Sequence, residues 1–190
     1  SAGIQKEDGA GAKTMVSPVG VLAKARLPWL IVGLFGGILA AQIITLFEGT
    51  LSSNIILAAF IPLVVYMSDA IAAQTQMLYI RSLALHSFSS RKYLIKELKV
   101  GSLIGVVIAL VLFLTTLAIS GEVLIASILA VSIFLTAMTA ITMGLLIAWA
   151  LFRMGRDPAL GSGPFGTIAA DISSLIIYFT VATSFFAVWA

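Results

Sequence analysis

The sequence predicts an all-α membrane protein with five transmembrane helices, a cytoplasmic N-terminus and a C-terminus outside. The first observation behind this prediction is the composition: 61% of the 190 residues are hydrophobic and 10% are charged, whereas soluble domains average about 25% charged residues. The second is the placement of the basic residues, which gather in three segments between long apolar stretches. An apolar stretch of about 20 residues is long enough to cross a bilayer as a helix.

The chain divides into a polar tail and a membrane domain. Residues 1–26 lack the apolar core of a signal peptide, so we expect a cytoplasmic tail or linker there. Residues 27–190 form the expected transmembrane domain. Its five predicted spans cover about residues 27–47, 55–80, 100–119, 123–152 and 165–188.

The first two spans are marked by proline and glycine. Pro28 suits the first turn of the first span, where its missing N–H would have no helical partner. Gly33 and Gly37, four residues apart, predict a face on which another helix packs closely. Residues 48–54 predict a short turn, and Pro62 predicts a kink in the second span because it removes one helical hydrogen bond.

The last three spans follow in the same way. Residues 81–99 form a basic loop, and its second half, 92–99, is suited to begin the third helix at the membrane surface. The third span opens with a Gly-x-x-x-Gly pattern at Gly101, which predicts close packing, and the fourth carries no charge. Residues 153–164 predict a Gly- and Pro-rich connection, with Pro164 placed to start the last helix.

The orientation follows from the charges of the connections. The 11 Lys and Arg residues lie in the tail, in residues 81–99 and in residues 153–156, whereas the other two connections contain Glu48 or Glu122 and no basic residue. Cytoplasmic loops are enriched in basic residues, so the N-terminus is predicted inside. We expect a multi-pass protein of the plasma membrane, surrounded by the lipid bilayer.

Two carboxylates lie within the predicted spans. At 1.5 Å per residue, Asp69 and Asp171 stand about 18 Å and about 12 Å from the cytoplasmic ends of their helices, so they reach comparable depths. An aspartate at the bilayer centre costs at least about 2.5–3.5 kcal/mol, and such residues mark pathways or bound ions. Asp69 shares a helical face with Ala72 or Ala73 and with Gln76, and this face is predicted to point inward.

These two aspartates have no basic residue within the five spans to neutralise them. Each must therefore be protonated, hydrated or paired with a cation from solution. The chain has no Cys, and its one His, His86, lies in the basic loop, so an ion held by side chains is expected to have oxygen ligands. A wide carboxylate-lined site suits Mg²⁺, which keeps several of its waters. The sequence thus predicts a channel or transporter for Mg²⁺ or another divalent cation.

Two other interpretations use the same acids. One is a proton- or Na⁺-coupled secondary transporter, and the other is a membrane scaffold subunit in which the aspartates only bond neighbouring helices. An enzyme is not predicted, because Gly161-Ser162-Gly163 lacks the spacing of a nucleophile motif and no catalytic residue or cofactor-binding motif is found. No feature predicts a nucleic-acid partner.

The candidate site residues fall into three groups. Asp171 and Asp69 are the predicted ion ligands. The residues predicted to line the path or to bond the ion's ligands are Ser68, Ala70, Gln74 and Thr167. Glu48 is a candidate for attracting cations at the outer mouth.

Several short segments carry a resemblance to a known family. They are Arg26-Leu27-Pro28-Trp29-Leu30, Phe47-Glu48-Gly49-Thr50-Leu51, Ile61-Pro62-Leu63-Val64, Gln74-Thr75, Arg81-Ser82-Leu83-Ala84-Leu85, Asp157-Pro158-Ala159, Ser162-Gly163-Pro164 and Asp171. In this order, over about residues 26–189, the chain resembles the membrane domain of the MgtE family of magnesium channels and transporters. The resemblance implies a homodimer whose ion path follows the two-fold axis between the second and fifth helices, with Mg²⁺ bound at Asp171.

Two features differ from the family pattern. The family commonly has Gly-Gly-Asn, a small residue, Gly-Thr and Gln in the second span, where this chain has Ala70 at the Asn position and Asp69 one residue earlier. The additional acid predicts stronger ion binding or an altered ion preference. Family members also often carry cytoplasmic domains that sense Mg²⁺, whereas 26 residues precede the first predicted span here.

Overall fold

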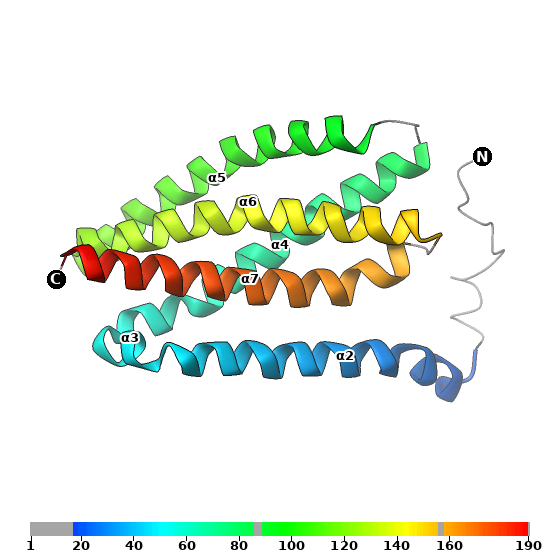
Figure 1. Cartoon of the computed structure of the whole chain (residues 1–190), viewed down its shortest axis with the longest axis horizontal. Coiled ribbons are helices and arrows are strands. Elements are labelled where there is room, and N and C mark those ends of the chain that lie inside the picture. Colours follow the sequence, from blue (N-terminus) through cyan, green and yellow to red (C-terminus); the bar gives the residue numbers. More distant parts are fainter. Residues whose placement is uncertain (1–16, 86–88, 156–157, 190) are drawn as a thin grey trace.

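The described part of the chain is helical throughout, apart from short connections. The structure is a computed structural model, and it describes residues 17–85, 89–155 and 158–189. Its helices are α2 (Val19–Leu46), α3 (Glu48–Ser53), α4 (Ile55–Leu85), α5 (Ser90–Ser120), α6 (Val123–Arg153) and α7 (Pro158–Trp189) (Figure 1). The all-α class is therefore confirmed. The predicted tail up to residue 16 and the loop position of His86 lie outside the described residues.

Four of these helices are long and apolar enough to cross a membrane. They are α4, α5, α6 and α7, and α2 adds a shorter apolar stretch, Leu30–Leu46. These lengths support the prediction of a polytopic membrane protein. A fifth span in α2 and the sides on which the termini lie stay predictions.

Helix α6 is the centre of the bundle. It packs against α4, α5 and α7, while α7 also contacts α4 and α2. More than half of the most apolar window of α6, 56%, is buried, compared with 17% of the corresponding window of α5. Figure 1 shows α2 at one edge of the bundle beside α7, with α4 crossing behind α6 and α7. The long uncharged fourth span is therefore the helix around which α4, α5 and α7 assemble, while α2 packs on α7.

The two ends of the bundle differ in charge. The start of α2, the end of α4, the start of α5 and the end of α6 lie at one end, and α3, the α5–α6 turn and the end of α7 lie at the other (Figure 1). The described Lys and Arg residues all belong to the first end, namely Lys24, Arg26, Arg81, Arg91, Lys92, Lys96, Lys99 and Arg153. This distribution is consistent with the predicted orientation.

Two predicted boundaries of the first half are wrong. Helix α2 begins at Val19, so Pro28 lies inside it rather than in its first turn. The expected turn 48–54 is mostly the short helix α3, Glu48–Ser53. In both places the chain stays helical where proline or small polar residues suggested an end, because these residues weaken a helix without forbidding it.

The second half has one confirmed boundary and one that differs from the prediction. Residues 92–99 belong to the first turns of α5, so the third long helix does begin in the second half of the basic segment. Helix α7 begins at Pro158, six residues before the expected start, and Pro164 lies inside it. Pro158 occupies the first helical position, where a missing N–H costs nothing, and so it, rather than Pro164, fills the role assigned to proline.

Glycines set the separation of several helices. Gly101 and Gly105 are buried, and a side chain at either would press on Ile141 or Phe134 of α6, which confirms the packing predicted for the third span. A Cβ added at Gly33 or Gly37 would meet no atom of another helix within 4 Å, whereas one at Gly36 would run into Ile168 of α7. The contact face of α2 is therefore rotated from the predicted one.

Candidate functional site

Helices α4 and α7 run antiparallel, and three contacts define how they lie against each other. Near one end, the Tyr178 hydroxyl donates to the carbonyl of Leu57 (2.8 Å). In the middle, the Ser68 hydroxyl donates to the carbonyl of Ala170 (3.2 Å) in a buried hydrogen bond. Further along, the Gln76 side chain lies against Gly166. Residue numbers rise along α4 as they fall along α7, so the two helices place residues 57–76 beside residues 166–178.

The central contact brings the two predicted acids together. Asp69 and Asp171 directly follow Ser68 and Ala170, both are half-buried, and their carboxylates are close enough to interact electrostatically. Neither 55–80 nor 165–188 contains Lys, Arg or His. Two carboxylates from separate helices therefore lie near each other, and neither helix segment supplies a basic residue to neutralise them.

Two polar atoms in this region lack hydrogen-bond partners. Among the buried side-chain atoms that the structure describes, Oδ1 of Asp171 and Nε2 of Gln76 have none. A buried polar group left unpaired costs about 1–3 kcal/mol, more if it is charged. Water or a hydrated cation at this position would remove that cost.

Gln76 is held between glycines of two other helices. A Cβ on Gly166 of α7 would run into the Gln76 amide. A Cβ on Gly144 of α6 would lie 3.0 Å from the carbonyl oxygen of Ala72 and 3.4 Å from Cγ of Gln76. Ala72 and Gln76 are both buried, so the face predicted to point inward does so. The glycines were not among the candidates, although glycine within an apolar helix is itself a sign of close approach.

The other candidates are placed unequally around the aspartates. Ser68 is buried and supplies the central hydrogen bond, and Thr167 is exposed one turn before Asp171 on the same face of α7. Ala70 is exposed. Gln74 lines a small cavity of about 40 Å³ with Thr75 and Glu97, so it faces α5 rather than the aspartate pair.

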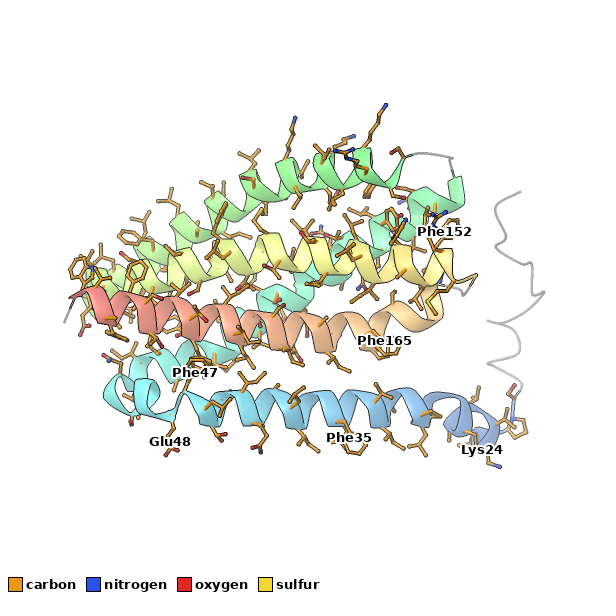
Figure 2. All side chains as sticks on the ribbon, viewed as in Figure 1. Lys24, Phe35, Phe47, Glu48, Phe152 and Phe165 are labelled. Atoms are coloured by element: carbon orange, nitrogen blue, oxygen red, sulfur yellow. The ribbon has the colours of Figure 1, made fainter. Side chains whose placement is uncertain are left out.

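Glu48, the candidate for the outer mouth, lies apart from the site. It is the first residue of α3 and is exposed, and Figure 2 shows its side chain pointing away from the bundle. Its position at the end of the bundle that lacks described basic residues agrees with the predicted side, but it does not contact the aspartates' region through any described interaction.

The described residues do not form a complete metal site by themselves. No group of three or more His, Cys, Asp or Glu side chains gathers within the part of the chain that the structure covers. The Asp69 and Asp171 carboxylates supply acidic oxygens from two helices, which suits a hard cation that keeps part of its water shell. Further ligands would have to be waters, carbonyls or residues of another copy.

Comparison with known proteins gives a consistent result. The model of the MgtE family, described as a divalent cation transporter, matches residues 61–181, a range that contains both aspartates. The chain is 34% identical to the magnesium transporter MgtE of Bacillus subtilis over 168 residues, which are 87% of this chain and 37% of that protein.

Two further relatives carry the same name. The magnesium transporter MgtE of Enterococcus faecalis is 30% identical over 166 residues, 86% of this chain and 37% of the relative. That of Thermus thermophilus is 30% identical over 161 residues, 83% of this chain and 36% of the relative. The chain thus spans little more than a third of the length of these curated relatives. The matches confirm the resemblance found in the sequence and agree with the prediction that the chain is not an enzyme.

Proposed function

We propose that this chain, which belongs to the MgtE family of divalent cation transporters, moves Mg²⁺ across a membrane along a path at Asp69 and Asp171. The observation that carries this proposal is the convergence of these two carboxylates, from α4 and α7, beside the Ser68–Ala170 hydrogen bond. A charged pair inside an apolar bundle, with no basic residue on either helix segment, is stable when a cation or water balances it.

The chemistry of the pair suits a hydrated ion. Carboxylate oxygens accept hydrogen bonds from the waters of Mg²⁺ or replace one of them, and Mg²⁺ gives up its waters reluctantly. Oδ1 of Asp171, which has no partner among the described atoms, is free to take either role. The Gln76 amide lies two turns along the same face of α4, toward the basic end, and offers a neutral polar group for the same water shell.

The proposed path lies at the two-fold axis of a homodimer, between the α4 and α7 helices of two copies. Polar or small residues next to the aspartates are exposed in a single copy, including Ala73 on α4 and Gly163 and Thr167 on α7. Such residues favour close approach of another helix over contact with lipid. A second copy placed there would bring four carboxylates to one axis and would supply ligands that one chain lacks.

The proposed setting is the plasma membrane with the basic end of the bundle in the cytoplasm. The described Lys and Arg residues lie at that end, which supports a cytoplasmic N-terminus and a C-terminus outside. In this orientation the outer ends of α4 and α7 are those closed by the Leu57–Tyr178 contact.

The test is Mg²⁺ flux into liposomes that contain the purified chain and an internal Mg²⁺ indicator. Asp171→Asn and Asp69→Asn keep the side-chain shape and remove the charge. Each is expected to reduce the flux at least tenfold, which corresponds to a loss of about 1.4 kcal/mol or more in stabilisation of the ion. Glu122→Gln, at an exposed turn, is the matched control and should leave the flux unchanged. Undiminished flux in both aspartate variants, with the variants folded, would refute the proposal.

The same liposomes separate passive flux from coupled transport. Under the proposal, Mg²⁺ enters down its own gradient at equal pH and equal Na⁺ on both sides. A flux that requires a proton or Na⁺ gradient would instead assign the carboxylates to ion coupling. Absence of flux, together with a co-purifying membrane partner, would favour a scaffold role.

A further inference from the structure

An apolar cleft lies at the basic end of the bundle, between the end of α4, the start of α5 and the end of α6. Its volume is about 350 Å³, which is within the range of sites for small molecules. Leu94, Leu145, Leu146 and Trp149 supply its apolar lining. Leu146 is 44% exposed and Trp149 is 39% exposed, so the cleft opens on the outer surface of the bundle rather than on the aspartates.

The rim of the cleft is polar and positively charged. Arg91 lines it and is exposed. Arg153 is not among the lining residues, but its guanidinium lies over the ring of the lining residue Trp149, with Cζ 5.7 Å from the ring centroid. Ser90 lines it as well, and its hydroxyl is hydrogen bonded to that of Tyr79 (2.8 Å). No acidic residue is among those described as lining the cleft.

The surroundings of the cleft indicate where it lies in a bilayer. The exposed residues Arg81, Lys92, Lys96 and Lys99 belong to the same end of the bundle. Arginine and lysine at a helix end lie at the level of the lipid headgroups, and a partly exposed tryptophan near a helix end, such as Trp149, is typical of the membrane–water interface. The apolar lining then faces the first part of the acyl chains, and the arginines face the phosphates.

We propose that this cleft binds an anionic phospholipid of the cytoplasmic leaflet. One acyl chain lies against Leu94, Leu146 and Trp149, and the headgroup phosphate accepts hydrogen bonds from Arg91 and Arg153. Arginine binds phosphate through a planar fork of donors, and two arginines at a cleft that no described acidic residue lines favour a negative headgroup over a zwitterionic one. Basic pockets between helices on the cytoplasmic side are suited to anionic headgroups for this reason. The proposal depends on the orientation of the bundle but not on the identity of the transported ion.

The test uses the fluorescence of Trp149. The chain has three Trp residues, so the double substitution Trp29→Phe and Trp189→Phe leaves Trp149 as the only one. The full chain in detergent micelles is mixed with phosphatidylglycerol or phosphatidylcholine that carries bromine on its acyl chains, at equal mole fractions. Bromine quenches the indole only when the brominated acyl chain lies close to the indole ring. Quenching is normalised to the same lipids without bromine, which removes direct effects of substitutions near the indole.

The expected result is half-maximal quenching by phosphatidylglycerol at a several-fold lower mole fraction than by phosphatidylcholine. Arg91→Gln and Arg153→Gln should each weaken this preference roughly fivefold, the factor expected for one basic residue at an anionic surface. The pair Lys92→Gln and Lys96→Gln, on exposed positions of α5 that do not line the cleft, is the matched control and should keep most of the preference.

Three results would overturn the proposal. The first is equal quenching by the two lipids in the chain that retains both arginines, and this comparison needs no variant at the rim. The second is a preference that survives loss of both arginines. The third is relief of quenching by millimolar inorganic phosphate, which would assign the arginines to a soluble anion rather than to a lipid.

Discussion

The outer and middle parts of the α4–α7 contact differ in chemistry. In the outer part, the Tyr178 hydroxyl bonds to the carbonyl of Leu57 on α4, and beside it Phe179 of α7 stacks on Phe47 at the end of α2 with ring centroids 4.7 Å apart. In the middle, small and polar side chains meet, and the buried atoms Oδ1 of Asp171 and Nε2 of Gln76 have no partner among the described atoms.

This difference suggests separate roles for the two parts. The outer part holds α4 and α7 together, and the middle part offers a binding site. The outer part is packed with large side chains and its Tyr178 hydroxyl has a partner, so it fixes how α4 and α7 lie against each other. The middle part leaves polar atoms unsatisfied, at a cost that packing alone would not require. Residues that carry such a cost inside a membrane are usually functional. Substitutions of large side chains in the outer part should therefore act on stability, and substitutions of the unpaired polar groups in the middle should act mainly on ion flux.

The largest effect on stability is expected for Phe179→Ala. Phe179 is fully buried and stacks on Phe47, which Figure 2 shows at the end of α2, directed toward α7. Truncation of a buried Phe leaves a cavity and costs about 3–5 kcal/mol. The measurement is reversible unfolding in mixed micelles. Phe35→Ala, on the 66% exposed Phe35 of α2, is the control and should change the free energy of unfolding by less than about 0.5 kcal/mol. Equal losses of unfolding free energy in the two variants would contradict the conclusion that the outer part stabilises the bundle.

A smaller effect is expected for Gly144→Ala in the middle part. The added Cβ would lie 3.0 Å from the backbone oxygen of Ala72, so α6 and α4 must separate slightly, at a cost of about 1–3 kcal/mol. Gly37→Ala, where nothing lies within 4 Å, should instead stabilise α2 by about 0.5–1 kcal/mol, the usual gain of Ala over Gly in a helix. Opposite signs of the two changes in unfolding free energy are the diagnostic result, and stabilisation by both would show that α4 and α6 are not in close contact.

The smallest effect on stability, with a clear effect on flux, is expected for Gln76→Leu. Nε2 of Gln76 has no partner to lose, so an apolar side chain of similar size should leave the free energy of unfolding unchanged or raise it by about 1 kcal/mol. Mg²⁺ flux should fall several-fold, because the polar group beside the hydrated ion is gone. Gln42→Leu, at an exposed position of α2, tests whether loss of any amide has this result. Flux equal to that of the unchanged chain would remove Gln76 from the path.

Much of the fold was predictable because it follows from local composition. Stretches of apolar residues indicated four of the long helices, and charge placement indicated their connections. The boundaries were less predictable. Pro164 suggested a helix start, yet α7 begins at Pro158, since a helix tolerates an internal proline when packing on α4 and α6 compensates for the lost hydrogen bond.

The acids of the candidate site were visible in the sequence, whereas their neighbours on other helices were not. Asp69 and Asp171 stand out in the sequence because an acid inside an apolar helix is rare. Gln74 and Gln76 were both visible on the second span, and only the packing shows that Gln76 lies with Gly166 while Gln74 faces Glu97 of α5. Two positions apart on a helix lie about 200° apart, so one of the two had to point elsewhere.

The sequence by itself determined that the chain is a helical membrane protein, which apolar stretches form its long helices and which acids they carry, because these properties depend on the hydropathy and charge of consecutive residues. The tertiary structure decided which helix is central, that Gly36 rather than Gly33 faces α7, and that the two aspartates lie close enough to interact electrostatically. The physical reason is that lipid and protein interior are both apolar. Most helices in this setting have little polar surface to reveal their orientation, so the fit of side chains against neighbouring helices determines most of the residues that point inward.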